Sequence, residues 1–310
     1  MTPTTVGNWR RVPPVPTLAF KQTALCIGPP ERVFLTTGTS QGAEQRGRHG
    51  VSDLRLYQRS ALASLGTFLF PDVAKIRLLS LIWPSGERPE SSLAQMADWA
   101  MEDFGDRDSA CFATGSRIDF AAFAAALRAS AAAGEPACIV TTTGALLHFF
   151  DHCRDHGLVF RLPHGSRIMD TGGLKGATRQ MSRNGIVRAI WETFAIPGYF
   201  VVNEYGMTEM SSPFFDNVVR NRIAGRFAPR FKVGPHWVRT RTLDPGTLAD
   251  TEAGAAGLLC HFDLANASSA ACVLTEDIGR LVDDGFEIVG RASGAETRGC
   301  SLAAAELAGT

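Results

Sequence analysis

The chain has 310 residues, of which 45% are hydrophobic, and its 31 basic and 31 acidic groups give a formal net charge of zero. A chain of this length can bury a sizeable core in one large domain or in two smaller ones. The even charge balance and the lack of a long charged block argue against nucleic acid or an anionic membrane surface as the partner. We therefore expect a small molecule or another protein.

The beginning of the chain carries no pattern that would direct it into or across a membrane. Residues 1–16 are polar and rich in proline, without the apolar core of a signal peptide, and no later run approaches the ~18 apolar residues of a transmembrane helix. The seven cysteines are scattered without a Cys-x-x-Cys pair, which argues against a disulfide framework and against a zinc ribbon. These features predict a cytoplasmic protein whose thiols are mostly buried and reduced.

Between residues 52 and 202 the predicted helices and strands alternate. The hydrophobic pattern predicts helices over 53–70, 91–104, 119–133, 145–156 and 179–194, and strands over 76–82, 137–141, 167–170 and 199–203. This order predicts an α/β fold with a mostly parallel sheet and helices on its faces. In such folds ligands bind at the carboxyl ends of the strands.

After Pro235 the pattern changes to short apolar runs separated by tight turns. The runs cover 237–243, 257–262 and 286–289, and the turns read Asp-Pro-Gly, Glu-Ala-Gly and Asp-Asp-Gly. We therefore expect a smaller β-rich subdomain to follow the α/β part. The predicted division is an N-terminal lead (1–30), an α/β domain (31–233), a β-rich subdomain (234–291) and a flexible tail (292–310).

The first segment that could carry chemistry is a loop rich in hydroxyl groups and glycine after an apolar strand. Residues 33–35 are apolar, and 36–42 read Thr-Thr-Gly-Thr-Ser-Gln-Gly, a composition that can wrap phosphate oxygens. It is not a Walker A loop, because the Gly-Lys-Ser/Thr ending is missing. A polar surface turn is one alternative. A hydrolase nucleophile elbow is another, since 38–42 fits G-x-S-x-G, but the elbow needs a helix that the polar run 43–50 does not predict.

The second segment follows the strand predicted over 199–203. It reads Tyr205-Gly206-Met207-Thr208-Glu209 and so offers an aromatic face, a hydroxyl and a carboxylate in close succession. That order suits a nucleotide base, a phosphate oxygen and a magnesium ion. A simple turn after a strand is the alternative.

The third segment, 275–291, has the pattern of a β-hairpin closed by Asp-Asp-Gly. A purely structural hairpin would explain the turn. It would not explain Asp277 and Arg291 at the open end, where a carboxylate and a guanidinium could hold ribose hydroxyls.

In this order the three segments resemble the adenylate-forming enzymes, which include acyl-CoA synthetases and phenylacetate-CoA ligases. Four further segments are similar to the LuxE-type acyl-protein synthetases, the fatty-acid-activating subunits of the bacterial bioluminescence reductase. These segments are Phe20-Lys21, 169–176, 235–239 and Arg298-Gly299-Cys300-Ser301-Leu302. The similarity extends from about residue 17 to the C-terminus.

The resemblance implies ATP and Mg²⁺ as cofactors and a carboxylic acid as the substrate. The acid would attack ATP to give an acyl-adenylate and pyrophosphate, and a thiol would then take the acyl group. Glu209 would be the magnesium ligand and a catalytic carboxylate. The residues implied to bind ATP or AMP are Thr36, Thr37, Gly38, Thr39 and Ser40 at the triphosphate, Tyr205 and Gly206 at the adenine, Thr208 at the α-phosphate, and Asp277 and Arg291 at the ribose.

In the LuxE type the accepting thiol is a cysteine near the C-terminus, which implies Cys300 here. The residues support this role independently, since Arg298 favours the thiolate and glycines 294 and 299 allow the segment to move toward an activated carbonyl. A reductase or an acyl carrier would receive the acyl group. A free cysteine in a frayed terminus is the alternative.

The chain also departs from the adenylate-forming pattern. Many of these enzymes have a further C-terminal domain that supplies a lysine to adenylation, whereas only 19 residues follow Arg291 here. We therefore expect this lysine-bearing domain to be lacking. Lys175, in a Gly-Gly-x-Lys-Gly loop after a strand, is the candidate for neutralising phosphate or carboxylate charge, with a solvated loop lysine as the alternative.

Three histidines, 148, 152 and 156, lie on one face of a predicted helix. They could suggest zinc, but residues eight apart lie about 12 Å apart along a helix, so the three cannot share one ion. His148 is instead a candidate for the acyl pocket, together with Gly172 and Gly173, and a structural role is equally open for it.

The sequence thus predicts an ATP-dependent acid–thiol ligase that acts on a fatty or related acid. Two alternatives stay open: a ligase that delivers the acyl group to coenzyme A or a carrier protein, and a member that only binds nucleotide or acyl groups.

Overall fold

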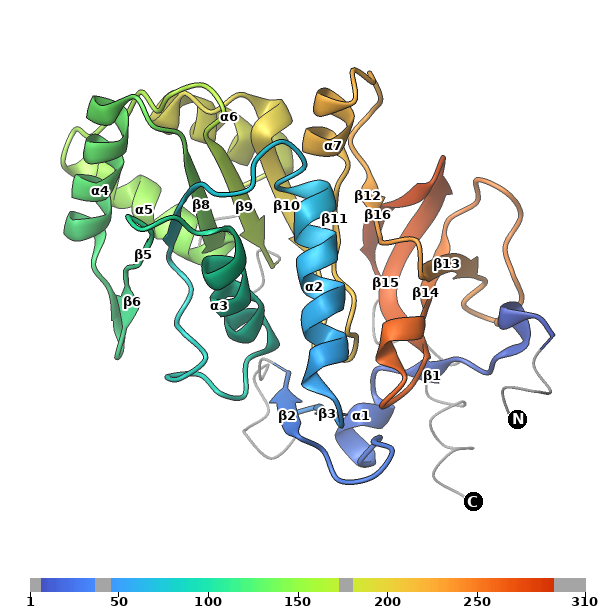
Figure 1. The fold of residues 1–310 in the computed structure, drawn as a ribbon. Helices are drawn as coiled ribbons and strands as arrows, with labels where there is room; N and C mark the ends of the chain where they lie inside the picture. The colour runs from blue at the N-terminus through green and yellow to red at the C-terminus, as the bar shows by residue number, and fades with distance from the viewer. Residues whose placement is uncertain (1–6, 37–45, 173–180, 293–310) are drawn as a thin grey trace. The chain divides into compact units, whose positions relative to one another are not determined.

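The computed structural model describes residues 7–36, 46–172 and 181–292 (Figure 1). The chain forms two compact units, each assembled from separate stretches of sequence. The first unit is Met1–Ala61, Met207–Phe214 and Phe231–Thr310, and the second is Leu62–Gly206 and Phe215–Arg230. The consecutive domain boundaries predicted from the sequence stay a prediction.

The second unit is built on a parallel sheet, as the alternating pattern predicts. Strands β10, β9, β8, β4 and β5 are neighbours in this order, and each pair is parallel. Strands β4 and β9 are buried along their whole length, which is typical of a sheet covered on both faces. The strands of this unit are β4 (Arg77–Ser80), β5 (Ala110–Cys111), the small β6 (Ala113–Thr114) and β7 (Arg117–Ile118) hairpin, β8 (Ala137–Thr142), β9 (Arg167–Thr171), β10 (Val201–Tyr205) and β11 (Phe214–Asp216), whose first residue belongs to the first unit.

The helices begin where a side chain can accept a bond from the free N–H groups of the first turn. Ser91, Asp119, Thr142 and Ser182 cap four of them in this way. Helices α3 and α4 contact β4, and α5 contacts β8 and β9. The helices are α2 (Leu54–Phe68), whose residues up to Ala61 belong to the first unit, α3 (Ser92–Phe104), α4 (Phe120–Ala133), α5 (Thr143–Asp155), α6 (Arg183–Phe194) and α7 (Val218–Ile223), and the unit also has a 3-10 turn, η4 (Gly198–Phe200).

Two predicted boundaries differ from the structure for local physical reasons. The helix predicted over 179–194 begins at Arg183, because the Ser182 hydroxyl accepts the bond of its first turn. The strand predicted over 199–203 begins at Val201, because residues 198–200 form the 3-10 turn, closed by a bond from the Phe200 N–H to the Pro197 carbonyl of 2.8 Å. Residues 179 and 180 lie outside the described parts of the chain.

The first unit contains the β-rich region predicted after Pro235. Its neighbouring strands are, in order, β13, β14, β15, β16 and β12, and each neighbouring pair is antiparallel. Strand β1 pairs with β15 in parallel. The predicted hairpin forms from β15 and β16, with Asp283 at positive φ in its turn. The elements are η2 (Trp9–Arg11), β1 (Val15–Pro16), α1 (Ala19–Gln22), β2 (Arg32–Leu35), β3 (Arg48–Val51), β12 (Lys232–Val233), β13 (Val238–Leu243), β14 (Gly257–Asp263), η5 (Leu264–Asn266), β15 (Cys272–Val282) and β16 (Gly285–Arg291).

An ion pair with a buried guanidinium fastens the first residue of β9 in the second unit. The Arg167 guanidinium, 1% exposed, donates to both carboxylate oxygens of Asp72, at 2.6 and 2.9 Å, and to the Leu69 carbonyl at 2.8 Å. Burial raises the pKa of Asp72, but the bonds from Arg167 outweigh it and hold the pKa below its usual value. Removing only the arginine would leave the Asp72 carboxylate and the Leu69 carbonyl without this donor.

We predict that Arg167→Met lowers the free energy of unfolding by about 1–3 kcal/mol, because the Asp72 carboxylate and the Leu69 carbonyl lose their charged donor. Chemical denaturation measures this change. Arg154→Met is the matched control, since Arg154 pairs with Asp151 and Asp155 at the surface and is 61% exposed; its loss should change the stability by less than about 1 kcal/mol. An equal effect of both substitutions would contradict this account.

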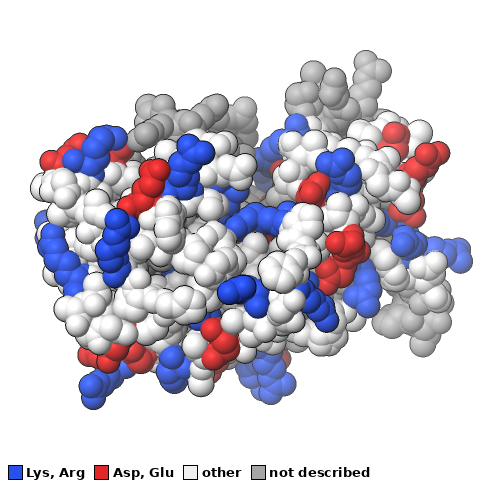
Figure 2. Space-filling view, turned by 90° about the horizontal axis from the view of Figure 1, so that it is seen from above, with Lys and Arg blue, Asp and Glu red and all other residues white. Residues whose placement is uncertain are grey.

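On the face shown in Figure 2, acidic and basic side chains are interspersed. None of the helices in the three described stretches of the chain is long and apolar enough to cross a bilayer.

Candidate active site

The Tyr-Gly-x-Thr-Glu segment forms a turn with a buried carboxylate. The chain passes from the second unit to the first between Gly206 and Met207. The Met210 N–H then donates to the Met207 carbonyl at 3.2 Å, so Thr208 and Glu209 are the central residues of the turn. Glu209 is only 8% exposed. The alternative of a simple turn is thus right about the backbone, but a buried carboxylate needs a further explanation.

Asn266 holds the backbone of this turn from the other side. Its buried side-chain amide donates to the carbonyl of Glu209 at 2.9 Å and to that of Ala270 at 2.8 Å. The Ser211 hydroxyl donates to the Asn266 side-chain oxygen at 2.9 Å. Three bonds therefore fix the amide, and the amide fixes the position of Glu209.

A second buried carboxylate, Asp263 at the end of β14, holds the residues that follow the turn. It accepts from the Ser212 hydroxyl at 2.7 Å and from the Ser211 N–H at 3.3 Å. Burial raises the pKa of Asp263 to about 6, although these bonds oppose the shift. The Trp237 indole in turn donates to the Ser212 hydroxyl at 3.0 Å. The segment 207–212 is therefore fixed by side chains from well beyond it in the sequence.

Thr36 and Glu209 face the same small space beside Gly47. The Gly47 N–H donates to the Thr36 hydroxyl at 2.8 Å. A Cβ placed on Gly47 would lie 3.0 Å from the Thr36 methyl group and 3.7 Å from a carboxylate oxygen of Glu209. The glycine thus keeps room where a hydroxyl and a carboxylate meet. Arg46 donates to the Thr36 carbonyl at 2.6 Å and keeps this part of the loop in place.

The environment of Glu209 favours binding of a cation. Burial raises its pKa to about 7, and the negative charges of Glu276 and Asp277 add to the shift, while the ammonium of Lys21 opposes it. A carboxylate held near half ionisation by burial and by like charges gains stability when a cation arrives.

Lys21 is held near this carboxylate by a packed aromatic pair. Phe20 is 1% exposed, and its ring meets the His49 ring edge-on with centroids 5.9 Å apart. His49 is itself buried, and burial lowers its pKa to about 4, so it is neutral at physiological pH. The helix turn that bears Lys21 is thus anchored to β3, and Lys21 is exposed.

The hairpin brings Asp277 and Arg291 together, as predicted. They are directly opposite each other in the β15–β16 pair, and the Arg291 Nε lies 3.7 Å from an oxygen of Asp277. Arg291 also pairs with Glu276 at 2.8 Å. The Asp277 N–H donates to the Thr275 hydroxyl at 3.0 Å, which steadies the backbone there. The open end of the hairpin therefore presents two carboxylates and one guanidinium.

In the second unit, a polar network occupies the carboxyl ends of β9 and β10. Asp170 is fully buried, and it accepts from the Thr143 hydroxyl at 2.9 Å and from Arg183 at 2.6 Å. The Asn203 amide donates to the same carboxylate at 3.2 Å. The Thr171 hydroxyl bonds to Glu204. Polar side chains therefore gather at the edge of the sheet where α/β folds bind ligands.

The remaining predicted residues of this unit lie at or near the same strand ends. Tyr205 is the last residue of β10, and Gly206 follows at a point where any Cβ would collide with the Glu204 carboxylate. Gly172 directly follows β9 at a φ of +87°. His148 is exposed on α5.

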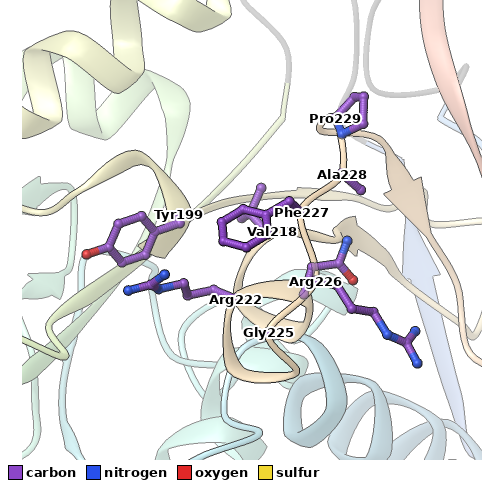
Figure 3. Close-up of a pocket in the computed structure, with 9 residues that line it drawn as sticks. Tyr199, Val218, Arg222, Gly225, Arg226, Phe227, Ala228 and Pro229 are labelled. Carbon is purple, nitrogen blue, oxygen red and sulfur yellow. The ribbon is translucent and has the colours of Figure 1, made fainter.

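A pocket of about 440 Å³ lies elsewhere on the second unit, beside α7, where Arg222 extends over the Tyr199 ring at 4.7 Å (Figure 3). None of the residues predicted from the sequence lines it, so it is not the predicted site.

Several predicted residues lie outside the described parts of the chain: Thr37, Gly38, Thr39, Ser40, Gly173, Lys175 and Cys300. The strand before the first loop, β2, pairs in antiparallel fashion with β3. Within the described residues, no group of three or more His, Cys, Asp or Glu side chains is placed to hold a metal ion.

The residues present fit a magnesium–nucleotide complex. Magnesium is commonly bound through one or two protein carboxylates together with phosphate oxygens and water. Glu209 supplies one such carboxylate, and a Cβ on Gly47 would lie 3.4 Å from the Thr36 hydroxyl and 3.7 Å from a Glu209 carboxylate oxygen, so both groups face the position that this glycine leaves empty. The fit to a magnesium–nucleotide complex is inferred from the positions of Glu209, Thr36 and Gly47.

The raised pKa of Glu209 predicts a pH dependence of stability. Between the ordinary value of 4.5 and about 7, the folded protein binds a proton that the unfolded chain releases, so this group makes stability fall as pH rises through that window. Glu209→Gln removes the effect. We expect the variant to be more stable than the parent at pH 8, by about 2–3 kcal/mol, and equal to it near pH 4.5. Thermal or chemical unfolding at both pH values measures this, and a constant difference would contradict it.

Sequence reasoning missed four residues that shape this site. Lys21 was part of a recognised segment but received no role, while His49, Asn266 and Asp263 stand in no motif. A neutral buried histidine and a buried amide have no sequence pattern by which they could be recognised. Asp263 could have been suspected, because a carboxylate directly after an apolar strand needs partners.

The comparisons with known proteins agree with one another. A family model described as acyl-protein synthetase, LuxE, matches residues 108–308. A long-chain-fatty-acid–luciferin-component ligase from Vibrio harveyi is 24% identical over 198 residues, which cover 61% of this chain and 50% of that protein. A ligase of the same name from Aliivibrio fischeri is 23% identical over 167 residues, covering 50% of this chain and 42% of that protein. The chain thus spans about half the length of the curated relatives it matches.

Solved structures show the same fold. An open conformation of a 2-hydroxyisobutyryl-CoA ligase, in complex with 2-HIB-AMP and CoA, matches with a TM-score of 0.63 and 16% identity, covering 91% of this chain and 64% of that one. ATP-bound MatB from Rhodopseudomonas palustris matches with a TM-score of 0.56 and 14% identity, covering 84% and 47%. These likenesses confirm the predicted α/β fold class.

Proposed function

Because this chain belongs to the LuxE acyl-protein synthetase family, we propose that it uses ATP to activate a carboxylic acid and passes the acyl group to a thiol. A fatty acid is the substrate we favour, since the curated relatives are named long-chain-fatty-acid ligases. The acid-activating step is the centre of the proposal.

The observation that carries it is the buried carboxylate of Glu209, which faces the same side of Gly47 as the Thr36 hydroxyl. A carboxylate without a fixed cationic partner in such a place is costly in the free protein. The cost is recovered when a cation binds. Magnesium held there would neutralise phosphate charge as pyrophosphate leaves.

The predicted nucleotide-binding residues have separate roles in the proposal. Thr36 and Thr208 offer their hydroxyls to phosphate oxygens, and Lys21 offers a positive charge near Glu209. Asp277, with Arg291 beside it, accepts bonds from the ribose hydroxyls. Tyr205 gives an aromatic face to the adenine. The predicted roles of Thr37, Gly38, Thr39, Ser40 and Lys175 at the phosphates remain part of this proposal.

The reaction has two steps. First, an oxygen of the substrate carboxylate attacks the α-phosphorus of ATP, the bond to the β-phosphate oxygen breaks, and pyrophosphate leaves with the electron pair. The product is an acyl-adenylate. Second, the Cys300 thiolate attacks the acyl carbon, the carbon–oxygen bond to AMP breaks, and a thioester forms. An acyl-protein reductase or an acyl carrier would then accept the acyl group.

Pyrophosphate release tests the proposal. The full chain is incubated with ATP, Mg²⁺ and a panel of carboxylic acids that ranges from acetate to long-chain fatty acids. We expect pyrophosphate and AMP to form only when an acid of the right length is present. ADP as the nucleotide product, or no acid dependence, would overturn the proposal. Thioester formation on added coenzyme A instead of the protein would favour the coenzyme A ligase alternative.

A further inference from the structure

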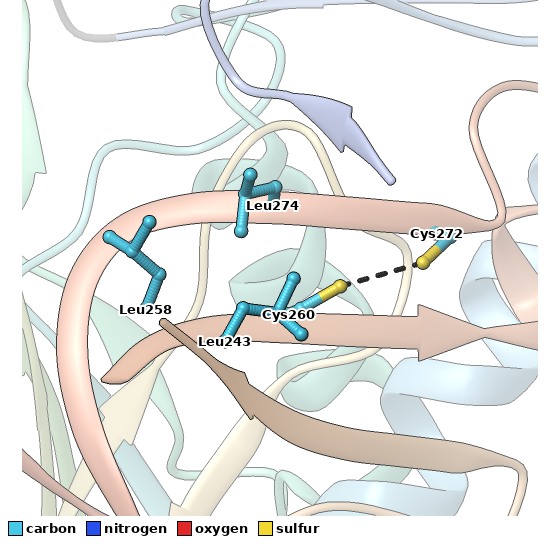
Figure 4. Packing of buried hydrophobic residues seen from close by; sticks show 5 residues of the cluster. All are labelled: Leu243, Leu258, Cys260, Cys272 and Leu274. Atoms are coloured by element: carbon cyan, nitrogen blue, oxygen red, sulfur yellow. Dashed lines mark hydrogen bonds between the residues drawn. The ribbon is translucent and has the colours of Figure 1, made fainter. Parts of the chain in front are cut away.

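Two cysteines meet inside the antiparallel sheet of the first unit. Cys260 on β14 and Cys272 on β15 are 0% and 2% exposed, and they pack with Leu243, Leu258 and Leu274 (Figure 4). Their sulfur atoms are 3.5 Å apart and share a hydrogen bond. The acid-activating chemistry proposed above uses neither thiol.

The strand register explains why the two sulfur atoms meet. Cys260 is opposite Leu274, and Phe262 is opposite Cys272, so the cysteines are diagonal neighbours on one face of the sheet. A disulfide has a sulfur–sulfur distance of 2.03–2.05 Å. The sulfur atoms need to approach by roughly 1.5 Å to form this bond. Diagonal neighbours are usually about 7–8 Å apart, so the two strands also have to shift toward each other.

A buried arginine adds chemical asymmetry to this pair. Arg241 on β13 is directly opposite Cys260 in the register and is 8% exposed. Its guanidinium donates to the Arg10 carbonyl at 2.8 Å. The bond from Cys272 and then the charge of Arg241 lower the pKa of Cys260, against the effect of burial. The pKa of Cys272 is raised, chiefly by its bond to Cys260. The pKa of Cys260 is thus the lower of the two, which favours Cys260 as the nucleophile.

The other described cysteines show the contrast. Burial raises the pKa of Cys138 and of Cys153 to about 12, and burial also raises the pKa of Cys26 and Cys111. Among the six cysteines in the described stretches, only Cys260 has a lowered pKa. A soft metal ion is a poor occupant for the pair, because the Arg241 charge beside Cys260 would repel it.

We propose that Cys260 and Cys272 are a redox-active dithiol that a small peroxide converts to an intramolecular disulfide and that a soluble thiol restores. The Cys260 thiolate attacks one oxygen of hydrogen peroxide, and the oxygen–oxygen bond breaks. Cys260 becomes a sulfenic acid, and the hydroxide that leaves takes a proton to give water. The Cys272 sulfur then attacks the sulfenic sulfur and loses its proton, and a second water leaves. The two thiols lose two electrons, and the peroxide gains them.

The disulfide would join the strands that lead to the candidate active site. Cys260 is three residues before Asp263, and Cys272 is five residues before Asp277. Closing a short loop restricts the unfolded chain, so oxidation should raise the thermal midpoint. This inference does not depend on the proposed function.

Peptide mapping after digestion with trypsin tests the proposal. Residues 242–280 contain no lysine or arginine before Arg280, so trypsin releases both cysteines on one peptide. The reduced full chain is treated with hydrogen peroxide, alkylated and digested. We expect this peptide to lose two hydrogens and resist alkylation, and dithiothreitol to reverse both changes. A peptide that stays alkylated while other thiols oxidise would overturn the proposal.

Variants test whether disulfide formation needs both cysteines and the charge of Arg241. Cys260→Ala and Cys272→Ala should each abolish the change in this peptide, whereas Cys153→Ala should leave it intact. Arg241→Met should slow disulfide formation at pH 7 at least 10-fold, and Arg241→Lys should restore most of the rate. Circular dichroism checks that each variant is folded. An Arg241→Met variant that is folded and oxidises at the parent rate would contradict the role of the charge.

Discussion

Replacing Glu209 by glutamine is expected to reduce acid-dependent pyrophosphate release by about 100-fold or more. The amide is almost the same size as the carboxylate but cannot be the anionic ligand of magnesium, and loss of one preorganised electrostatic group costs about 10²–10³ in rate. Steady-state release of pyrophosphate at saturating ATP measures the effect.

The stability of Glu209→Gln distinguishes a loss of catalysis from a loss of folding. Because burial raises the pKa of Glu209 to about 7, glutamine should stabilise the fold at pH 8 while it removes activity. Glu276→Gln is the matched control: Glu276 also carries negative charge near Glu209, but its side chain is 44% exposed and pairs with Arg291. We expect that control to retain activity within about threefold. Parent-like activity in Glu209→Gln would remove Glu209 from the proposed mechanism.

Replacing Cys300 by serine is expected to abolish a thioester on the protein without abolishing activation of the acid. After incubation with ATP, Mg²⁺ and the preferred acid, intact-protein mass spectrometry should show one acyl group on the parent chain. Hydroxylamine should remove it. Cys300→Ser should lack the adduct and still release one equivalent of pyrophosphate as the acyl-adenylate forms.

The control for this result is Cys111→Ser, because Cys111 is an exposed cysteine in the described part of the chain. That variant should carry the acyl group like the parent. An adduct that persists in Cys300→Ser would contradict the acyl-protein step. Such a result would leave activation of the acid untouched, so the two parts of the proposal can fail separately.

The sequence predicts the fold well where a regular pattern repeats. The apolar run at 137–141 becomes β8, because strands buried on both faces need mostly apolar side chains. The strand predicted over 167–170 is also present, as β9. The turn residues around 283–285 correctly predict the hairpin that pairs Asp277 with Arg291. Both signals are local, so one sequence is enough to detect them.

The sequence predicts less of the structure where contacts between residues far apart in the sequence determine it. Asn266 holds Glu209 across 57 positions, and His49 lies against the Thr208 backbone from β3. No spacing rule connects such partners, because folding brings them together. The 3-10 turn before β10 was missed for a related reason, since Pro197 and Tyr199 read equally well as the beginning of a strand.

Glu209 also shows why the stability of this fold and its proposed chemistry oppose each other. Its carboxylate has no direct hydrogen-bonded cation in the described contacts, and its pKa rises accordingly. A better-paired residue would make the folded protein more stable and the binding of a magnesium–nucleotide complex weaker. Residues that weaken a fold for this reason are common at functional sites.

The most direct test of the account follows an oxygen atom from the acid to the nucleotide. The full chain is incubated with ATP, Mg²⁺ and a fatty acid labelled with ¹⁸O in its carboxylate, and AMP is analysed by mass spectrometry. Activation through an acyl-adenylate leaves one labelled oxygen on AMP, because the carbon–oxygen bond breaks when the thiol attacks. Label in phosphate or pyrophosphate, or AMP without label, would contradict the proposed function.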